Sequence, residues 1–127
     1  MSTAVAAPPS GHEILHIAGE MTIYRAAELK QELLSALDSA AALDIDLSQV
    51  TELDCSGVQL LLLARRIAAG RPLAVRFVAH SDAVRTTLAT LGLAADFPDQ
   101  GAPAPEAAAT ARLDVQSIQD VNHHHAI

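Results

Sequence analysis

The chain has 127 residues, a formal net charge of −7 and an apolar content of 50%, which fits one globular domain with a tail. The acidic balance argues against nucleic acid as a partner, because a phosphate backbone needs a basic surface. Aromatic residues are few and Trp is absent, which argues against stacking platforms for bases. No 18-residue stretch is free of charge and no secretory leader is recognisable, so we expect a cytoplasmic protein without membrane insertion.

The composition divides the chain into three parts. Residues 1–11 are small and rich in Pro and Gly, which predicts a flexible leader. Residues 12–98 carry the apolar periodicity expected of a folded domain. Residues 99–127 begin with a low-complexity linker over 99–111 and end in a tail with a weak helical spacing of apolar residues.

The first predicted elements are a strand and a helix. Residues 13–18 alternate between apolar and polar side chains, which predicts a strand that ends in a turn at Gly19. Residues 23–37 place apolar side chains at steps of three and four, which predicts an amphipathic helix with Ile23 on its apolar face. Thr22 is the expected N-cap of this helix.

Two further strand–helix pairs follow. Residues 42–47 alternate as a strand of period two, and residues 48–54 are expected to form a connection. The long apolar run over 57–69 predicts a buried helix, residues 73–79 predict a strand, and a short helix is expected over 81–91. The order β-α-β-α-β-α predicts an α/β fold with a small, mostly parallel sheet and crossover helices.

The most informative segment is Asp54-Cys55-Ser56-Gly57, between a strand and the buried helix. Asp54 is the expected cap, and Gly57 permits another backbone to approach closely. Ser56 falls in the first turn, where the positive end of the helix dipole tolerates a phosphate that Asp54 would repel. Capping alone would also select these residue types, so the segment is interpreted either as a plain helix cap or as a site where Ser56 carries a phosphate.

The chain resembles the STAS domain family, which includes the anti-sigma factor antagonists. The resemblance rests on three stretches and covers about residues 12–97; the stretches are GEMTIYRAAELKQELLSAL, LDIDLSQVTELDCSGVQLLLLARRIA and LAVRFVAHSDAVRTTLATLGL. Its most specific element is the Asp-x-Ser-Gly turn before a Leu-rich helix, which is Asp54 to Gly57 in this sequence.

The resemblance implies a non-catalytic protein–protein switch in the bacterial cytoplasm. In the family, the serine before the glycine is phosphorylated by a serine kinase that doubles as the anti-sigma factor, and Ser56 falls on that position. Unphosphorylated antagonist binds the kinase and frees the sigma factor. By the same resemblance Asp54, Cys55 and Gly57 form the turn at the partner surface, and Thr22 lies near it. The alternative is a constitutive scaffold subunit of a chemosensory or lipid-transport ABC complex, in which Ser56 is only a helix cap.

Enzymatic, redox and metal-binding functions have little support in the sequence. Cys55 could act as a nucleophile or redox sensor beside a helix N-terminus, yet a lone cysteine is more often an apolar core residue. A serine or cysteine hydrolase would need a histidine near Ser56, and no motif surrounds the candidates, His12, His16 and His80. We therefore expect no catalytic residues.

Three other features of the sequence are weighed in the same way. The triplet His123–His125 could bind a divalent metal, but its place in the tail makes an incidental run the better interpretation. No Gly-rich phosphate loop is present, so we expect no nucleotide or other cofactor and no metal. Arg65 and Arg66 suit the last turns of their helix, and an acidic partner surface is the alternative explanation for them.

Overall fold

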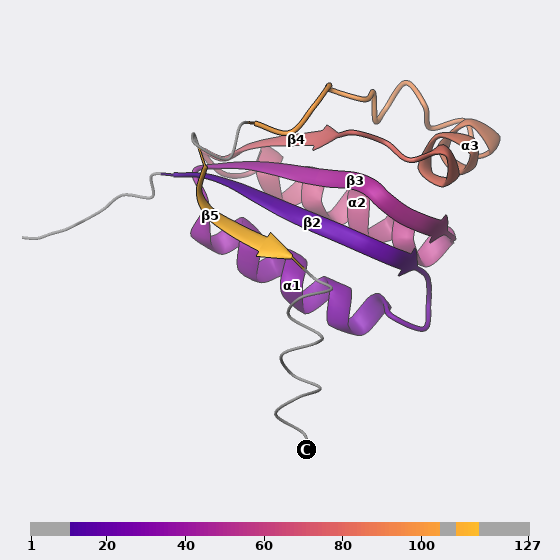
Figure 1. Cartoon of the computed structure of the whole chain (residues 1–127), viewed down its shortest axis with the longest axis horizontal. Helices are drawn as coiled ribbons and strands as arrows, with labels where there is room; N and C mark the ends of the chain where they lie inside the picture. Colours follow the sequence, from indigo (N-terminus) through magenta and orange to yellow (C-terminus); the bar gives the residue numbers. More distant parts are fainter. Residues whose placement is uncertain (1–10, 105–108, 115–127) are drawn as a thin grey trace, which may run out of the picture.

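A parallel sheet with helices in the crossovers forms the framework, as the sequence predicts. The computed structural model describes residues 11–104 and 109–114. The elements are, in chain order, β2 (His12–Met21), α1 (Ala26–Ser39), β3 (Ala42–Leu53), α2 (Cys55–Ala69), β4 (Ala74–Val78), α3 (Asp82–Thr90) and β5 (Ala109–Asp114). The strand order is β4-β3-β2-β5 and all three pairings are parallel (Figure 1).

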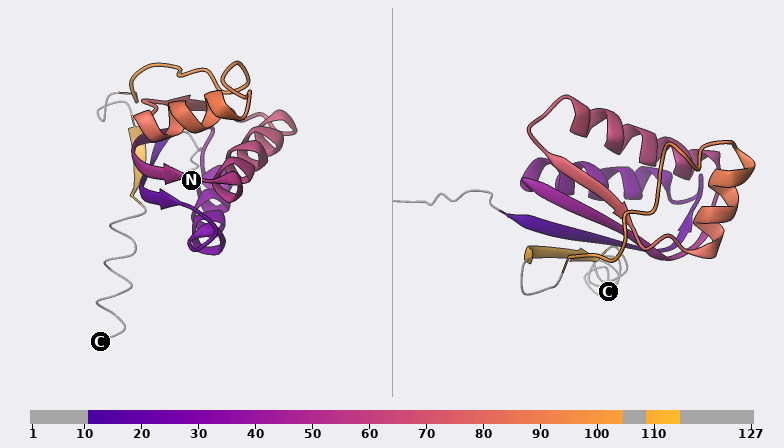
Figure 2. Two further views of the ribbon diagram at one scale, coloured as in Figure 1. Left: turned by 90° about the vertical axis from the view of Figure 1, so that its right-hand side faces the viewer. Right: turned by 90° about the horizontal axis from the view of Figure 1, so that it is seen from above.

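The main core lies between one face of the sheet and helices α1 and α2. These two helices pack side by side on that face, while α3 sits near the carboxyl ends of the strands (Figures 1 and 2). The apolar residues of the alternating segment in β3, Leu43, Ile45 and Leu47, are all fully buried. Each fully buried aliphatic side chain contributes about 1.5–3 kcal/mol, so this face carries much of the stability.

The first two strands are longer than the alternation predicts. β3 continues through the expected connection to Leu53, and β2 continues past Gly19 to Met21, with which Leu53 is in register. Register shifts between His16 and Ala18 and between Gly19 and Glu20 interrupt the ladder. Gly19 has φ 86°, so it supplies the left-handed conformation of a bulge within β2, and the expected turn at this residue is wrong.

Helix α1 begins later than predicted, at Ala26. Its N-cap is Arg25, which makes no side-chain capping hydrogen bond. Thr22 is not the cap; its carbonyl instead accepts a 2.9 Å hydrogen bond from the Arg25 N–H, which closes a turn ahead of the helix. Ile23 lies in that turn with its side chain 66% exposed, so it does not belong to the apolar face of α1.

Residues after α3 return to the sheet. Along the edge of β4, Gln100 N–H donates to the Phe77 carbonyl at 3.0 Å and Ala79 N–H donates to the Gly101 carbonyl at 2.8 Å. This contact covers an edge that would otherwise present unpaired backbone groups. β5 then pairs with β2 on the opposite edge, and this strand is not predicted from the sequence. The predicted helical spacing of the tail and His123–His125 lie outside the described residues, and the domain limit at residue 98 stays a prediction.

Candidate functional site

The segment after β3 is held by the side chain of Asp54. Its Oδ1 accepts hydrogen bonds from the backbone N–H groups of Ser56 at 2.8 Å and Gly57 at 3.1 Å, which caps α2. Its Oδ2 accepts from the Ile23 N–H at 3.1 Å, in the loop between β2 and α1. One carboxylate therefore fixes both the start of the helix and the neighbouring loop.

Gly57 lets α2 start directly against the end of β2. A Cβ atom at this position would lie 2.3 Å from the Met21 carbonyl oxygen and 2.5 Å from Leu53 Cδ1, closer than real contacts. The Asp54 N–H donates to that same Met21 carbonyl at 3.2 Å. The close approach that the sequence predicts for Gly57 is thus with the chain's own strand β2.

Ser56 and its neighbours form an exposed, partly apolar surface. Ser56 is half-buried in the first turn of α2, and its hydroxyl makes no hydrogen bond within the part of the chain that the structure describes. Cys55 beside it is exposed. The loop held by Asp54 presents Tyr24, 89% exposed, and Ile23. We call Ile23, Tyr24, Cys55 and Ser56 together the Ser56 surface.

Sequence reasoning did not find the exposed apolar part of this surface. Ile23 fits the three- and four-residue steps of α1, so periodicity alone assigns it to the core. In the fold, the Ile23 N–H donates to the Asp54 side chain, 31 positions later, and this residue lies in the turn before the helix; no local sequence signal marks this contact. Thr22 precedes Ile23 but is only 8% exposed, and its hydroxyl donates to Glu20 Oε1 at 3.4 Å. Its side chain is therefore part of the buried side of this loop and not of the exposed surface.

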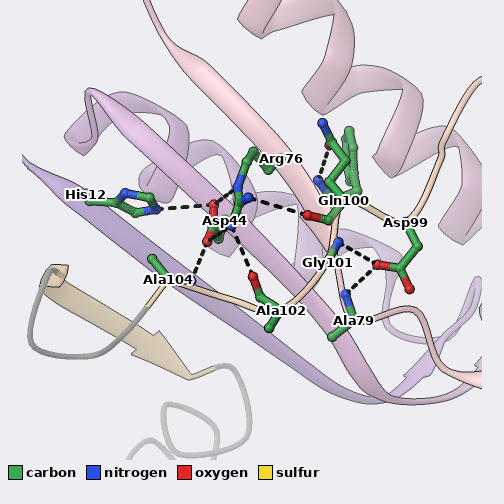
Figure 3. Close-up of polar contacts among 10 residues, drawn as sticks. His12, Asp44, Arg76, Ala79, Asp99, Gln100, Gly101, Ala102 and Ala104 are labelled. Carbon is green, nitrogen blue, oxygen red and sulfur yellow. Dashed lines mark hydrogen bonds and ion pairs between the residues drawn. The ribbon is translucent and has the colours of Figure 1, made fainter.

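A second polar cluster lies on the other face of the sheet, around Asp44 (Figure 3). Asp44 is 1% exposed and accepts two 2.9 Å hydrogen bonds from the Arg76 guanidinium. The Ala104 N–H donates to it at 2.8 Å, and His12 Nε2 lies 3.2 Å away. Arg76 also donates to the Ala102 carbonyl at 3.1 Å, so the cluster fastens residues 99–104 across the sheet.

The charge of Asp44 is stabilised by this cluster. Burial raises the pKa of its carboxyl, but the hydrogen bonds from Arg76, Ala104 and His12 outweigh burial, and the net pKa lies below the usual value. The hydrogen bond to Asp44 raises the pKa of Arg76 in turn. The alternation in 42–47 assigns Asp44 to the outer face, but it gives no sign that a later segment covers it.

The three histidines that the structure describes make their contacts away from Ser56. His12 is next to Asp44, and His16 Nδ1 lies 2.8 Å from Asp46 Oδ2. His80 is 6% exposed, and its backbone N–H donates to Asp99 Oδ2 at 3.0 Å. Burial lowers the pKa of the His80 imidazole, which favours its neutral form. These contacts do not bring an imidazole to Ser56 as a nucleophilic mechanism requires.

A metal-binding cluster and a membrane-spanning helix are both absent from the described residues. Over 11–104 and 109–114, no three His, Cys, Asp or Glu side chains gather closely enough to hold a metal ion. Within the same residues, no helix has the length and apolar character that a membrane crossing needs.

The comparisons with known proteins agree with one another on the fold. Residues 6–99 match the family model described as "Mlab, STAS domain". An anti-sigma factor antagonist from Mycobacterium paratuberculosis is similar in structure, with TM-score 0.59 and 28% identity over 75% of this chain and 81% of that one. No curated protein matches the sequence.

Two more distant structures share the fold. The anti-sigma factor antagonist SpoIIAA in its unphosphorylated form has TM-score 0.54 and 15% identity over 91% of this chain and 90% of its own. A sulfate transporter family protein from Wolinella succinogenes has TM-score 0.57 and 18% identity, over 87% and 83%. The family match spans all the residues from β2 to α3, including the turn from Asp54 to Gly57. The chain belongs to the STAS domain family.

Proposed function

We propose that this chain is a protein–protein interaction module whose binding is controlled by phosphorylation of Ser56. The observation that carries the proposal is the state of Ser56: a hydroxyl without a hydrogen-bond partner among the described residues, on a helix turn fixed by Asp54, beside exposed Ile23 and Tyr24. The similarity to anti-sigma factor antagonists, one of them described as unphosphorylated, supports the same assignment.

Phosphorylation would change this surface mainly through charge. A phosphate on Ser56 adds about −1.5 to −2 charges at neutral pH. The Ser56 and Gly57 N–H groups already donate to the Asp54 carboxylate, so the added phosphate would meet a negative neighbour and not an empty anion site. A partner that packs on Ile23 and Tyr24 would have to desolvate this charge, and a loss of about 1.4 kcal/mol already weakens binding tenfold.

The partner that fits this proposal is a serine kinase that doubles as an anti-sigma factor, or another signalling protein of a bacterial cytoplasm. The chain itself contributes no catalysis, cofactor, nucleic-acid contact or membrane insertion in this account. Its task is to bind while Ser56 is free and to dissociate once Ser56 is phosphorylated.

A constitutive scaffold is the second candidate function. It is favoured by the capping geometry, because the hydrogen bonds from Ser56 and Gly57 to Asp54 explain the Asp54–Gly57 turn as a helix cap without any modification of Ser56. The fold shared with the sulfate transporter family protein is compatible with a scaffold subunit in a transport complex. In that case the Ser56 surface would bind its partner irrespective of charge.

The two functions are separated by binding measurements on matched variants. The full chain is immobilised as wild type, Ser56→Ala, Ser56→Asp and Ser35→Asp, the last adding the same charge at an exposed position of α1. A partner retained by wild type, Ser56→Ala and Ser35→Asp but lost by Ser56→Asp supports the phospho-switch. Equal retention by all four variants would contradict it and favour the scaffold.

A further inference from the structure

A groove between the first two turns of α1 and residues 56–66 of α2 adjoins the Ser56 surface. Its volume is about 570 Å³, and its lining combines small or apolar residues with four polar ones: Ala26, Ala27, Lys30, Ser56, Gln59, Leu60, Leu62, Leu63 and Arg66. Leu60 is buried, whereas Leu62 and Leu63 keep part of their side chains exposed to the groove. None of the described residues that line it is acidic, although the chain carries 15 acidic and 8 basic residues.

The two cations of the groove, Lys30 and Arg66, differ from the other basic residues of the segment 11–104. Arg65, Arg71, Arg76 and Arg85 each pair with a carboxylate, and Arg25 donates to the Ala18 and Glu20 carbonyls. Within residues 11–104, Lys30 and Arg66 have no ion pair or side-chain hydrogen bond. Arg66 lies in the last turns of α2, where the helix dipole favours a cation, but Lys30 lies in the second turn of α1 and has no such role.

We propose that this groove binds an acidic amphipathic helix of the partner protein, with Lys30 and Arg66 pairing its carboxylates. The groove offers leucine side chains and two cations that have no carboxylate partner within residues 11–104, which is the complement of a helix with leucines on one face and acids beside them. Lys30 lies on α1 and Arg66 on α2, so an extended helix with several carboxylates can pair with both cations better than a single small anion can. The inference rests on the proposed function for the existence of a partner, and it defines the chemistry of that partner.

The position of Ser56 ties this groove to the proposed phosphorylation. Ser56 lines the groove together with both cations, so a phosphate there would add negative charge where the acidic helix binds. The phosphate would repel the helix and would compete with it for Lys30 and Arg66. This geometry predicts that phosphorylation dissociates acidic partners most strongly.

The test uses a defined probe and the full chain. The probe is a synthetic helical peptide with Leu at positions i, i+3 and i+7 and Glu on the flanking positions; its control carries Lys at every Glu. Binding is followed by chemical shifts of the ¹⁵N-labelled chain at increasing peptide concentration. We expect shifts at Ala27, Lys30, Gln59 and Leu63 with the Glu peptide, and weaker binding when salt rises, because exposed charges are screened.

Charge-matched variants test the role of the two cations. Lys30→Gln, Arg66→Gln and Gln31→Glu each lower the net charge by one, but Gln31 is exposed and does not line the groove. We expect Lys30→Gln and Arg66→Gln each to weaken binding of the Glu peptide about threefold to fivefold, the upper part of the range for an exposed ion pair. Gln31→Glu should change this binding less than twofold.

Several results would overturn the inference. Equal binding of the Glu and Lys peptides, equal effects of the three variants, or shifts confined to other elements would each do so. The groove would be assigned to a membrane if the Glu peptide fails to bind and the chain binds phosphatidylglycerol vesicles in a way that Lys30→Gln abolishes. It would be assigned to a second copy of the chain if the Glu peptide fails to bind and Lys30→Gln abolishes self-association in sedimentation. Glu-peptide binding that is equally strong in the wild type and in Ser56→Asp would support the groove and refute the switch, so the two failures are distinguishable.

Discussion

Replacing Gly57 by Ala tests whether the start of α2 is as tightly placed as the structure shows. The new Cβ atom would lie 2.3 Å from the Met21 carbonyl oxygen, 2.5 Å from Leu53 Cδ1 and 2.9 Å from Met21 Cβ. Leu53 can rotate away at some cost, but the Met21 carbonyl belongs to β2 and also accepts from the Asp54 N–H. The helix start must therefore move, and the Asp54 cap must move with it.

The expected loss of stability follows from two opposing contributions. Overpacking in a well-packed site costs about 1–3 kcal/mol, and a clash with fixed backbone belongs at the upper end. Alanine improves the helical propensity of this position by about 1 kcal/mol. We therefore expect Gly57→Ala to lower the free energy of unfolding by about 2 kcal/mol, which lowers the urea midpoint by about 1 M.

Urea unfolding followed by circular dichroism measures this loss, with Gly70→Ala as the matched control. Gly70 follows the same helix with φ −96°, and its Cβ atom would meet nothing closer than the Ile67 carbonyl at 3.8 Å. We expect the control to stay within about 0.5 kcal/mol of wild type. Gly57→Ala unfolding at the same urea concentration as Gly70→Ala would refute the close packing of α2 on β2.

The remaining predictions concern Asp54, Asp44 and His80. Asp54→Ala should cost about 1–2 kcal/mol in urea unfolding and shift the amide resonances of Ile23 and Ser56, because their hydrogen-bond acceptor is lost; Asp54→Asn, which keeps an acceptor oxygen, should cost less, and equal losses would contradict the capping argument. Asp44→Asn should cost about 2 kcal/mol, since Arg76 loses its carboxylate. The pKa of Asp44 is lowered in the folded state, so the stability that its charge contributes is present above the unfolded pKa near 4 and is lost as pH falls through the folded value. Urea midpoints measured between about pH 5 and pH 2 should therefore fall more steeply in wild type than in Asp44→Asn. Parallel curves for the two proteins would refute this argument. Burial lowers the pKa of His80, so its protonation favours the unfolded state and the free energy of unfolding should fall as pH drops below about 6.5; His80→Leu should flatten the urea midpoint between pH 7 and pH 5, and an unchanged slope would argue against a buried neutral imidazole.

The parts of the fold with regular periodicity could be predicted from the sequence. The alternation in 42–47 identified the buried face of β3, and the apolar run ending at Gly70 identified α2. The length of β3 was missed because two exposed residues in succession, Ser48 and Gln49, break the period of two. β2 accommodates the break by register shifts, which a single-strand pattern does not reveal.

The long-range contacts of the candidate site could not be predicted in the same way. The motif placed Asp54 as a cap and Ser56 on the first helix turn, since capping is local. The hydrogen bond from Ile23 to Asp54 joins residues 31 positions apart, so the exposure of Ile23 depends on the fold. The groove likewise requires α1 and α2 to be neighbours, although Arg66 had already suggested an acidic partner.

The occupancy of phosphate on Ser56 tests the central claim most directly. The protein is purified from its own cells during growth and under stress, and intact-mass and fragment-mass analysis locates and quantifies the modification. The account predicts a single phosphate on Ser56 whose occupancy differs between the two conditions, and none on the Ser56→Ala variant. Absence of phosphate from Ser56 under both conditions, in a chain that still binds its partner, would contradict the switch and favour a constitutive scaffold.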